Sequence, residues 1–212
     1  MKKRLSFLLI VLILIIGGWF YLISPSQHED KISQEKATAL IHALKKVNYI
    51  EQGLENAPHK LYAVVDPNCA FCHALFQASQ SFIKQGQLAV RWIVVGVVKP
   101  SSPTKAMTIL NAPSPLKALK ENEQYFNDHT EKGGIQGLLQ PEPKQIARLD
   151  QNIQAMRDFV STVPAIIYLN RRGHIVLSGG ERLKLAASPE ALKDNQHKLA
   201  QFLNQIENHW AS

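Results

Sequence analysis

Two cysteines, Cys69 and Cys72, are the only ones in the 212-residue chain, and they stand three positions apart. They follow a short apolar run at residues 61–65 and open a stretch whose apolar residues recur with helical spacing. Unpaired backbone N–H groups and the positive end of the helix dipole favour a thiolate at a helix N-terminus. Because the thiolate is the attacking species in disulfide exchange, we predict a redox dithiol with Cys69 as nucleophile and Cys72 as resolving thiol.

Two other interpretations of the cysteine pair stay open at the level of the residues. The pair could be a structural disulfide, although closing so short a loop stabilises a fold by only about 2 kcal/mol in the chain-entropy model. It could also be half of a metal site, because His73 adjoins it and zinc is held by cysteine and histidine. We instead expect His73 to be an exposed helix residue that modulates the electric field at the thiols.

The elements that must position the cysteines follow in the order strand, helix, strand, helical insertion, strand, strand, helix. Strands are predicted at residues 61–65, 88–98, 165–169 and 175–177, and helices at residues 70–85, 104–110, 115–126, 143–159 and from 189 onward. This is the thioredoxin order with extra helices after the second strand. A strand–helix–strand crossover implies parallel neighbours in a sheet covered on both faces. We therefore predict an α/β, thioredoxin-like fold, with the catalytic domain at residues 59–212.

A proline stands immediately before the third predicted strand, in the sequence Thr162–Val163–Pro164. In a thioredoxin-like fold, a proline at this position is cis and lies against the redox cysteines. The backbone of the residue before it is then exposed, so that a substrate chain can pair with it as an added strand. We therefore expect Thr162, Val163 and Pro164 to bind substrate. The alternative is an ordinary trans proline that begins an edge strand.

The N-terminus differs in composition from the rest of the chain. Three basic residues at positions 2–4 precede an uncharged run at residues 5–23, which as a helix spans roughly 28 Å, close to the thickness of a bilayer core. We predict a single N-terminal transmembrane helix within residues 1–27, a signal anchor that contacts the lipid bilayer, with a cleaved leader as the alternative. Either places the remainder outside the cytoplasm, in an oxidising compartment. Residues 28–58 are predicted to be a linker whose helix, at residues 34–47, is capped by Ser33.

The charge distribution bears on the class of partner. The formal charge is +7, and the three basic residues at positions 2–4 supply part of it. The other basic residues stand in short, separated pairs such as Lys45–Lys46 and Arg171–Arg172. A nucleic-acid surface needs a continuous basic stripe with interleaved aromatic residues. We therefore expect no nucleic acid among the partners.

Three segments carry a resemblance to a known family: AVVDPNCAFCHALF at residues 63–76, VRWIVVGVVKPSSPTKAMTIL at residues 90–110, and TVPAIIYL at residues 162–169. They resemble the DsbG/DsbC family of periplasmic thiol:disulfide interchange proteins, and most closely the catalytic domain of its DsbG members. The middle segment carries no catalytic residue, which makes the match specific. The resemblance implies that Cys69 is the exposed nucleophile, Cys72 its buried partner and Pro164 the cis-proline. It implies no cofactor and no metal.

Three features depart from the family pattern. The N-terminal dimerisation domain has no counterpart, and the anchor and the helix at residues 34–47 stand in its place. The dipeptide between the cysteines is Ala70–Phe71, where DsbG has Pro and Tyr, so these two residues are expected to modulate the site differently. Val163 precedes the proline, where the family has Thr, and Val there resembles DsbA, a dithiol oxidase. The direction of electron flow is therefore not inherited from the resemblance.

The leading hypothesis is a periplasmic oxidoreductase, anchored to the bacterial inner membrane or soluble if the leader is cleaved. It would reduce or isomerise disulfides, or reduce cysteine sulfenic acids, on extracytoplasmic proteins that contain cysteine. Its partner would be a membrane reductase of the DsbD type. One alternative is a DsbA-like dithiol oxidase served by a DsbB-like oxidase. The alternative from another class is a non-catalytic metal-binding or assembly module.

Overall fold

The computed structural model describes residues 32–179, 183–185 and 188–206. The predicted membrane segment at residues 5–23 lies outside these ranges. Within them, none of the helices is both long and apolar enough to cross a bilayer.

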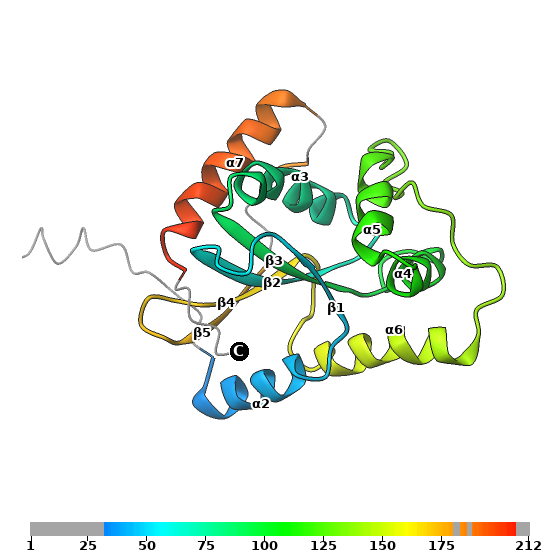
Figure 1. The fold of residues 1–212 in the computed structure, drawn as a ribbon, viewed down its shortest axis with the longest axis horizontal. Helices are drawn as coiled ribbons and strands as arrows, with labels where there is room; N and C mark the ends of the chain where they lie inside the picture. The colour runs from blue at the N-terminus through cyan, green and yellow to red at the C-terminus, as the bar shows by residue number, and fades with distance from the viewer. Residues whose placement is uncertain (1–31, 180–182, 186–187, 207–212) are drawn as a thin grey trace, which may run out of the picture.

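A mixed β-sheet forms the centre of the described chain (Figure 1). Its strands are β1 (Tyr49–Gln52), β2 (His59–Val65), β3 (Leu88–Val94), β4 (Ala165–Leu169) and β5 (Ile175–Gly179). Their spatial order is β1-β3-β2-β4-β5. Strands β2 and β3 are parallel, as the crossover predicts, and the remaining neighbours are antiparallel. The predicted α/β architecture is confirmed.

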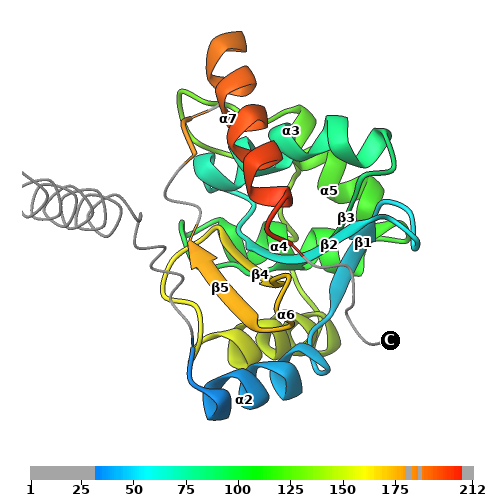
Figure 2. The ribbon, with the colours of Figure 1, turned by 90° about the vertical axis from the view of Figure 1, so that its left-hand side faces the viewer.

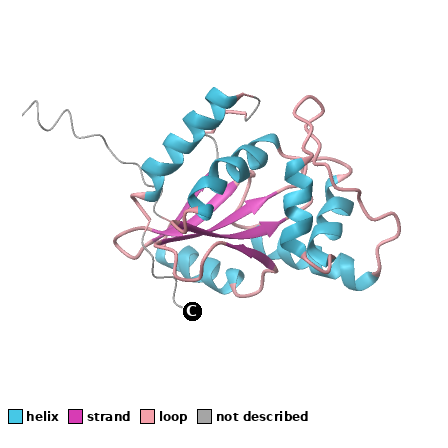
Figure 3. Cartoon of the chain, turned by 45° about the horizontal axis from the view of Figure 1, so that its top comes forward, coloured by secondary structure: helices cyan, strands magenta, loops and turns pink. Residues whose placement is uncertain are grey.

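Helices cover both faces of this sheet (Figures 2 and 3). The helices are α2 (Gln34–Leu44), α3 (Ala70–Lys84), α4 (Ser102–Asn111), α5 (Pro115–Gln124), α6 (Pro143–Met156) and α7 (Pro189–Leu203). Helices α3 and α7 lie on one face, and α2 and α6 on the other. Each face carries a hydrophobic core: the first includes residues of α3 and α7, and the second includes residues of α2 and α6. Side chains alternate along β2 between them, since Ala63 and Val65 belong to the first core and Tyr62 and Val64 to the second.

Local sequence signals explain where several elements begin and end. Ser33 accepts a hydrogen bond from the backbone of Lys36 and caps α2. Gly86 has a φ of 71° directly after α3, and Gly173 has a φ of 72° in the turn between β4 and β5. The predicted helical insertion is confirmed and consists of α4, α5 and α6 between β3 and β4.

Other features differ from the sequence-based prediction. Strand β1 was not predicted. Its four residues alternate between exposed and buried positions, but so short a pattern does not indicate a strand without its partner β3. Helix α2, predicted as part of a linker, buries Leu40 and Leu44 in the second core, while Ile41 is exposed. The described residues of this segment, 32–58, thus include a strand of the sheet and a helix packed on it. Strand β3 ends at Val94 instead of residue 98.

Candidate active site

Cys69 occupies the junction between strand β2 and helix α3. Its thiol is at the N-cap position of α3 and accepts a hydrogen bond from the backbone N–H of Cys72 at 3.3 Å. Both cysteines are free thiols. Cys69 exposes 7% of its surface and Cys72 only 2%. The expectation of an exposed Cys69 is therefore wrong, because the residue is buried, although it lines a groove and is the more open of the two cysteines.

The environment drives the two thiol pKa values in opposite directions. The hydrogen bond from the Cys72 thiol, helped by the backbone N–H groups of Cys72 and Phe71, lowers the pKa of Cys69 against the opposing effect of burial. Burial is the largest cause that raises the pKa of Cys72 well above its usual value. The Cys72 hydrogen bond and the N–H groups of the helix N-terminus therefore favour the thiolate at Cys69, and burial favours the protonated form of Cys72.

The segment before strand β4 lies against the same thiol. The peptide bond between Val163 and Pro164 is cis, as predicted. The carbonyl oxygen of Val163 lies 3.5 Å from the sulfur of Cys69 and accepts its hydrogen bond. Thr162 and Val163 line a groove with Cys69, whereas Pro164 is buried. Of the three residues predicted to bind substrate, Thr162 and Val163 thus line the groove with the predicted nucleophile, and Pro164 does not.

The groove beside Cys69 has a volume of about 520 Å³ and is predominantly apolar. One wall is formed by the residues after β3, where Val97 and Val98 expose 59% and 44% of their surfaces. Helix α6 and the segment after it also line the groove, with Ile153, Met156, Arg157 and Val160. A nucleophile that opens into an apolar groove can receive a protein chain whose residues near the reacting sulfur are apolar.

His73 differs most from its prediction. It is buried, with 4% of its surface exposed. Its Nδ1 lies 2.8 Å from Oε2 of Glu123 on α5, its Nε2 lies 3.0 Å from the side-chain nitrogen of Gln77, and its ring stacks on Phe126. The prediction of an exposed His73 is wrong because Glu123 near the end of α5 and Phe126 just after it contact its ring.

The two residues between the cysteines have unlike environments. Phe71 is exposed, and its backbone N–H contributes to the lowered pKa of Cys69. Ala70 is half-buried. In the described part of the chain, no group of three or more His, Cys, Asp or Glu side chains is placed to hold a metal ion. Both ring nitrogens of His73, the histidine beside the thiols, are already engaged.

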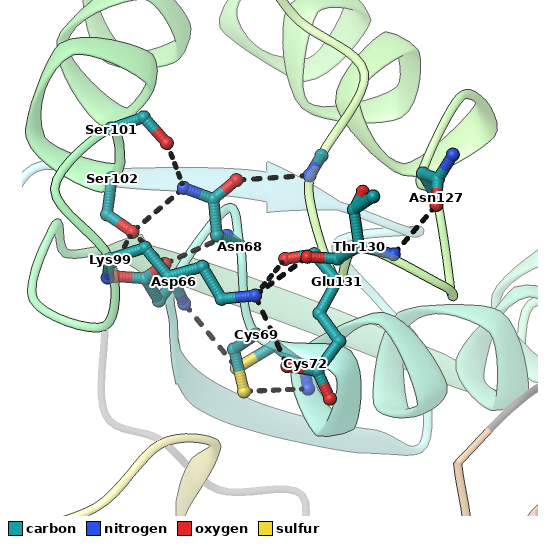
Figure 4. Close-up of polar contacts among 11 residues, drawn as sticks. Asp66, Asn68, Cys69, Cys72, Lys99, Ser101, Ser102, Asn127, Thr130 and Glu131 are labelled. Atoms are coloured by element: carbon teal, nitrogen blue, oxygen red, sulfur yellow. Dashed lines mark hydrogen bonds and ion pairs between the residues drawn. The ribbon is translucent and has the colours of Figure 1, made fainter.

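A buried polar network beside the thiols was not predicted (Figure 4). Asp66 and Asn68 flank Pro67 in the turn before Cys69, and both are essentially inaccessible to solvent. They bond to the segment of residues 97–102 and to the loop at Gly133. The available sequence signal is the Asp–Pro pair at the end of β2, which by itself indicates only the end of a strand.

Comparison with known proteins agrees with this geometry. No protein-family model matches the chain. The chain is 27% identical over 158 residues to the thiol:disulfide interchange protein DsbG of Pseudomonas aeruginosa, covering 68% of this chain and 59% of the relative. It is 29% identical over 165 residues to the same-named protein of Escherichia coli, covering 74% of this chain and 64% of the relative. The alignments thus span about three fifths of the length of these curated relatives.

Among solved structures, Proteus mirabilis ScsC in a transitional conformation superposes with a TM-score of 0.52 at 15% identity, covering 93% of this chain and 97% of that one. At this identity the likeness concerns the fold alone. The chain is thus a protein of thioredoxin-like fold that is similar in sequence to the DsbG thiol:disulfide interchange proteins.

Proposed function

We propose that this protein is an extracytoplasmic thiol:disulfide oxidoreductase that acts through Cys69 and Cys72. The observation that carries the proposal is the opposite direction of the two thiol pKa values within one turn of α3, beside an apolar groove. A structural disulfide needs neither an acidified thiol nor a groove that reaches it. The sequence similarity to DsbG proteins supports the same activity.

The exchange would proceed in two steps. The Cys69 thiolate attacks one sulfur of a substrate disulfide, forms a mixed disulfide, and releases the other substrate sulfur as a thiolate. Cys72 then gives up its proton, attacks the sulfur of Cys69 and releases the second substrate thiolate. Two electrons pass from the dithiol to the substrate, and the Cys69–Cys72 disulfide is left to be reduced. With a cysteine sulfenic acid as substrate, the first step releases its oxygen as water.

The substrates would be cysteine-containing proteins outside the cytoplasm. Thr162, which is exposed, and Val163, which is half-buried, line the groove beside Cys69, and this supports backbone pairing with an extended substrate chain there. An anchor at residues 5–23 would hold the domain at the periplasmic face of the inner membrane. A membrane thiol reductase of the DsbD type would supply electrons to reduce the Cys69–Cys72 disulfide.

Substrate trapping tests the assignment of roles. Changing Cys72 to Ala is expected to leave stable mixed disulfides through Cys69, because no second thiol remains to resolve them. Loss of the Cys72 hydrogen bond also raises the pKa of Cys69, so these adducts form more slowly. The measurement is non-reducing electrophoresis and mass spectrometry of envelope fractions that carry the variant. Cys69→Ala is the matched control, and trapping by that variant instead would reverse the two roles.

Dithiol oxidation is the second candidate function, and the lowered pKa of Cys69 favours it. A stabilised thiolate stabilises the reduced pair and makes its disulfide more oxidising. The reduction potential against glutathione separates the directions. A value of about −120 mV is expected of an oxidase, whereas a substantially more negative value is expected of a reductase. A zinc titration of the reduced protein tests the non-catalytic alternative, since thiolate ligation would release protons.

A further inference from the structure

Asp66 joins the redox turn to one wall of the groove. Its carboxylate accepts four hydrogen bonds. Figure 4 shows Asp66 beside two of the partners, Asn68 and Ser102. One oxygen accepts from the backbone N–H of Val97 at 2.6 Å and of Val98 at 3.0 Å. The other accepts from the backbone N–H of Asn68 at 2.8 Å and the hydroxyl of Ser102 at 2.7 Å. A buried polar group needs such partners, and here they bridge two separate segments.

The bonds to Val97 and Val98 determine where strand β3 stops. Val95 still pairs with β2 through the carbonyl of Val65, but the next backbone donors turn to the carboxylate. The two valine side chains therefore stand exposed on the groove instead of continuing the sheet. On its other side, the backbone N–H of Asp66 lies 3.4 Å from the sulfur of Cys72. One residue thus contacts both the dithiol and the groove wall.

Asparagine at this position cannot reproduce the arrangement. All four partners of Asp66 are donors, and a carboxylate has acceptor sites on both oxygens. An asparagine amide would replace one of the two oxygens with an NH2 group. That group is itself a donor and cannot accept hydrogen bonds from the two donors that face it. A charged acceptor also forms stronger hydrogen bonds than a neutral one. The position therefore requires a carboxylate if the wall is to be held where it is.

We propose that Asp66 is the positioning residue for substrate selection: it holds Val97 and Val98 as an apolar wall that favours protein substrates with an apolar residue beside the reacting cysteine. This inference rests on the proposed function. The groove that Cys69 lines is predominantly apolar, so the residue next to the substrate cysteine meets hydrocarbon there. Asp66 itself touches no substrate.

The test compares Asp66→Asn with Asn68→Ala in the full-length protein. Asn68→Ala removes three side-chain hydrogen bonds of the same buried network but leaves all four bonds to Asp66, because Asn68 donates there through its backbone. The probes are two fluorogenic peptide disulfides that differ only in having Leu or Ser beside the cysteine. Ellman's disulfide serves as a substrate without a peptide chain.

The wild-type protein is expected to prefer the Leu peptide by about tenfold in kcat/KM, the order of discrimination that a small apolar contact provides. Asp66→Asn should abolish most of this preference through KM, whereas Asn68→Ala should keep it. Both peptides meet the same thiol, so their ratio is insensitive to any change in the reactivity of Cys69. Equal preferences in wild type and Asp66→Asn would overturn the inference, as would equal losses in both variants.

Amide hydrogen exchange gives a readout that does not depend on activity. The N–H groups of Val97 and Val98 should exchange slowly in the wild type despite the exposure of their side chains, and fast in Asp66→Asn only. Fast exchange already in the wild type would refute the role of Asp66, even if the variant failed to fold. Failure of the wild type to reduce Ellman's disulfide as well as the peptides would instead count against the proposed function.

Discussion

Iodoacetamide is expected to alkylate Cys69 on the order of a hundredfold faster than Cys72 in the reduced protein at neutral pH, because the thiolate is the reacting species and Cys72 is sealed from solvent. The pKa of Cys69 is lowered by the Cys72 hydrogen bond, and burial raises the pKa of Cys72. Tandem mass spectrometry of the peptide that contains both residues gives the two rates separately. In urea the two rates should converge, since the folded environment alone distinguishes the thiols.

The pH dependence of this reaction follows from the direction of each shift. The Cys69 rate should rise with pH through its lowered pKa and level off while Cys72 is still protonated. Cys72 should gain reactivity only at much higher pH. A Cys69 that reacts as slowly as Cys72 at neutral pH would contradict the catalytic interpretation, because an inert buried thiol cannot initiate exchange.

The same shifts affect the stability of the reduced protein. Because the folded pKa of Cys69 is depressed, its contribution is present above the unfolded value and is lost as the pH falls through the folded value. The contribution of Cys72 has the opposite sign, since its folded pKa is raised. It is present below the unfolded value and is lost as the pH rises toward the folded one.

Changing His73 to Ala is expected to lower the free energy of unfolding by about 3–5 kcal/mol, the usual cost of removing one partner of a buried charged or polar pair. The variant leaves Glu123 buried, with Asn122 as its remaining hydrogen-bond partner in the described chain, and removes the ring that stacks on Phe126. Urea unfolding followed by tryptophan fluorescence measures the change. The pair also joins α3 to α5, so the insertion should loosen first.

An exposed ion pair provides the matched control for this prediction. Lys144 and Glu142 lie 2.9 Å apart with most of each side chain in solvent. Lys144→Ala should therefore change the free energy of unfolding by less than about 1 kcal/mol. If His73→Ala were as mild as Lys144→Ala, the buried contact between α3 and the insertion would contribute little to the fold.

The sequence by itself determined the elements that depend on near neighbours. Patterns that extend over only a few residues each indicate the apolar strands β2, β4 and β5, the helix after Cys69, and the breaks at Gly86 and Gly173. The order of these elements then allowed the parallel pairing of β2 with β3 to be predicted, because a short crossover leaves few alternatives. The cis bond before Pro164 also followed, from its place in that order and the family resemblance.

Only the tertiary structure decided the features that join distant segments. Asp66 meets the backbone of Val97, 31 residues along the chain, and His73 meets Glu123, 50 residues along. A local pattern cannot show that the N–H groups just after β3 donate to the carboxylate of Asp66, or that His73 is buried against Glu123. The physical reason is that these hydrogen bonds exist only after the sheet and the insertion have brought their partners together, whereas apolar periodicity acts within each element.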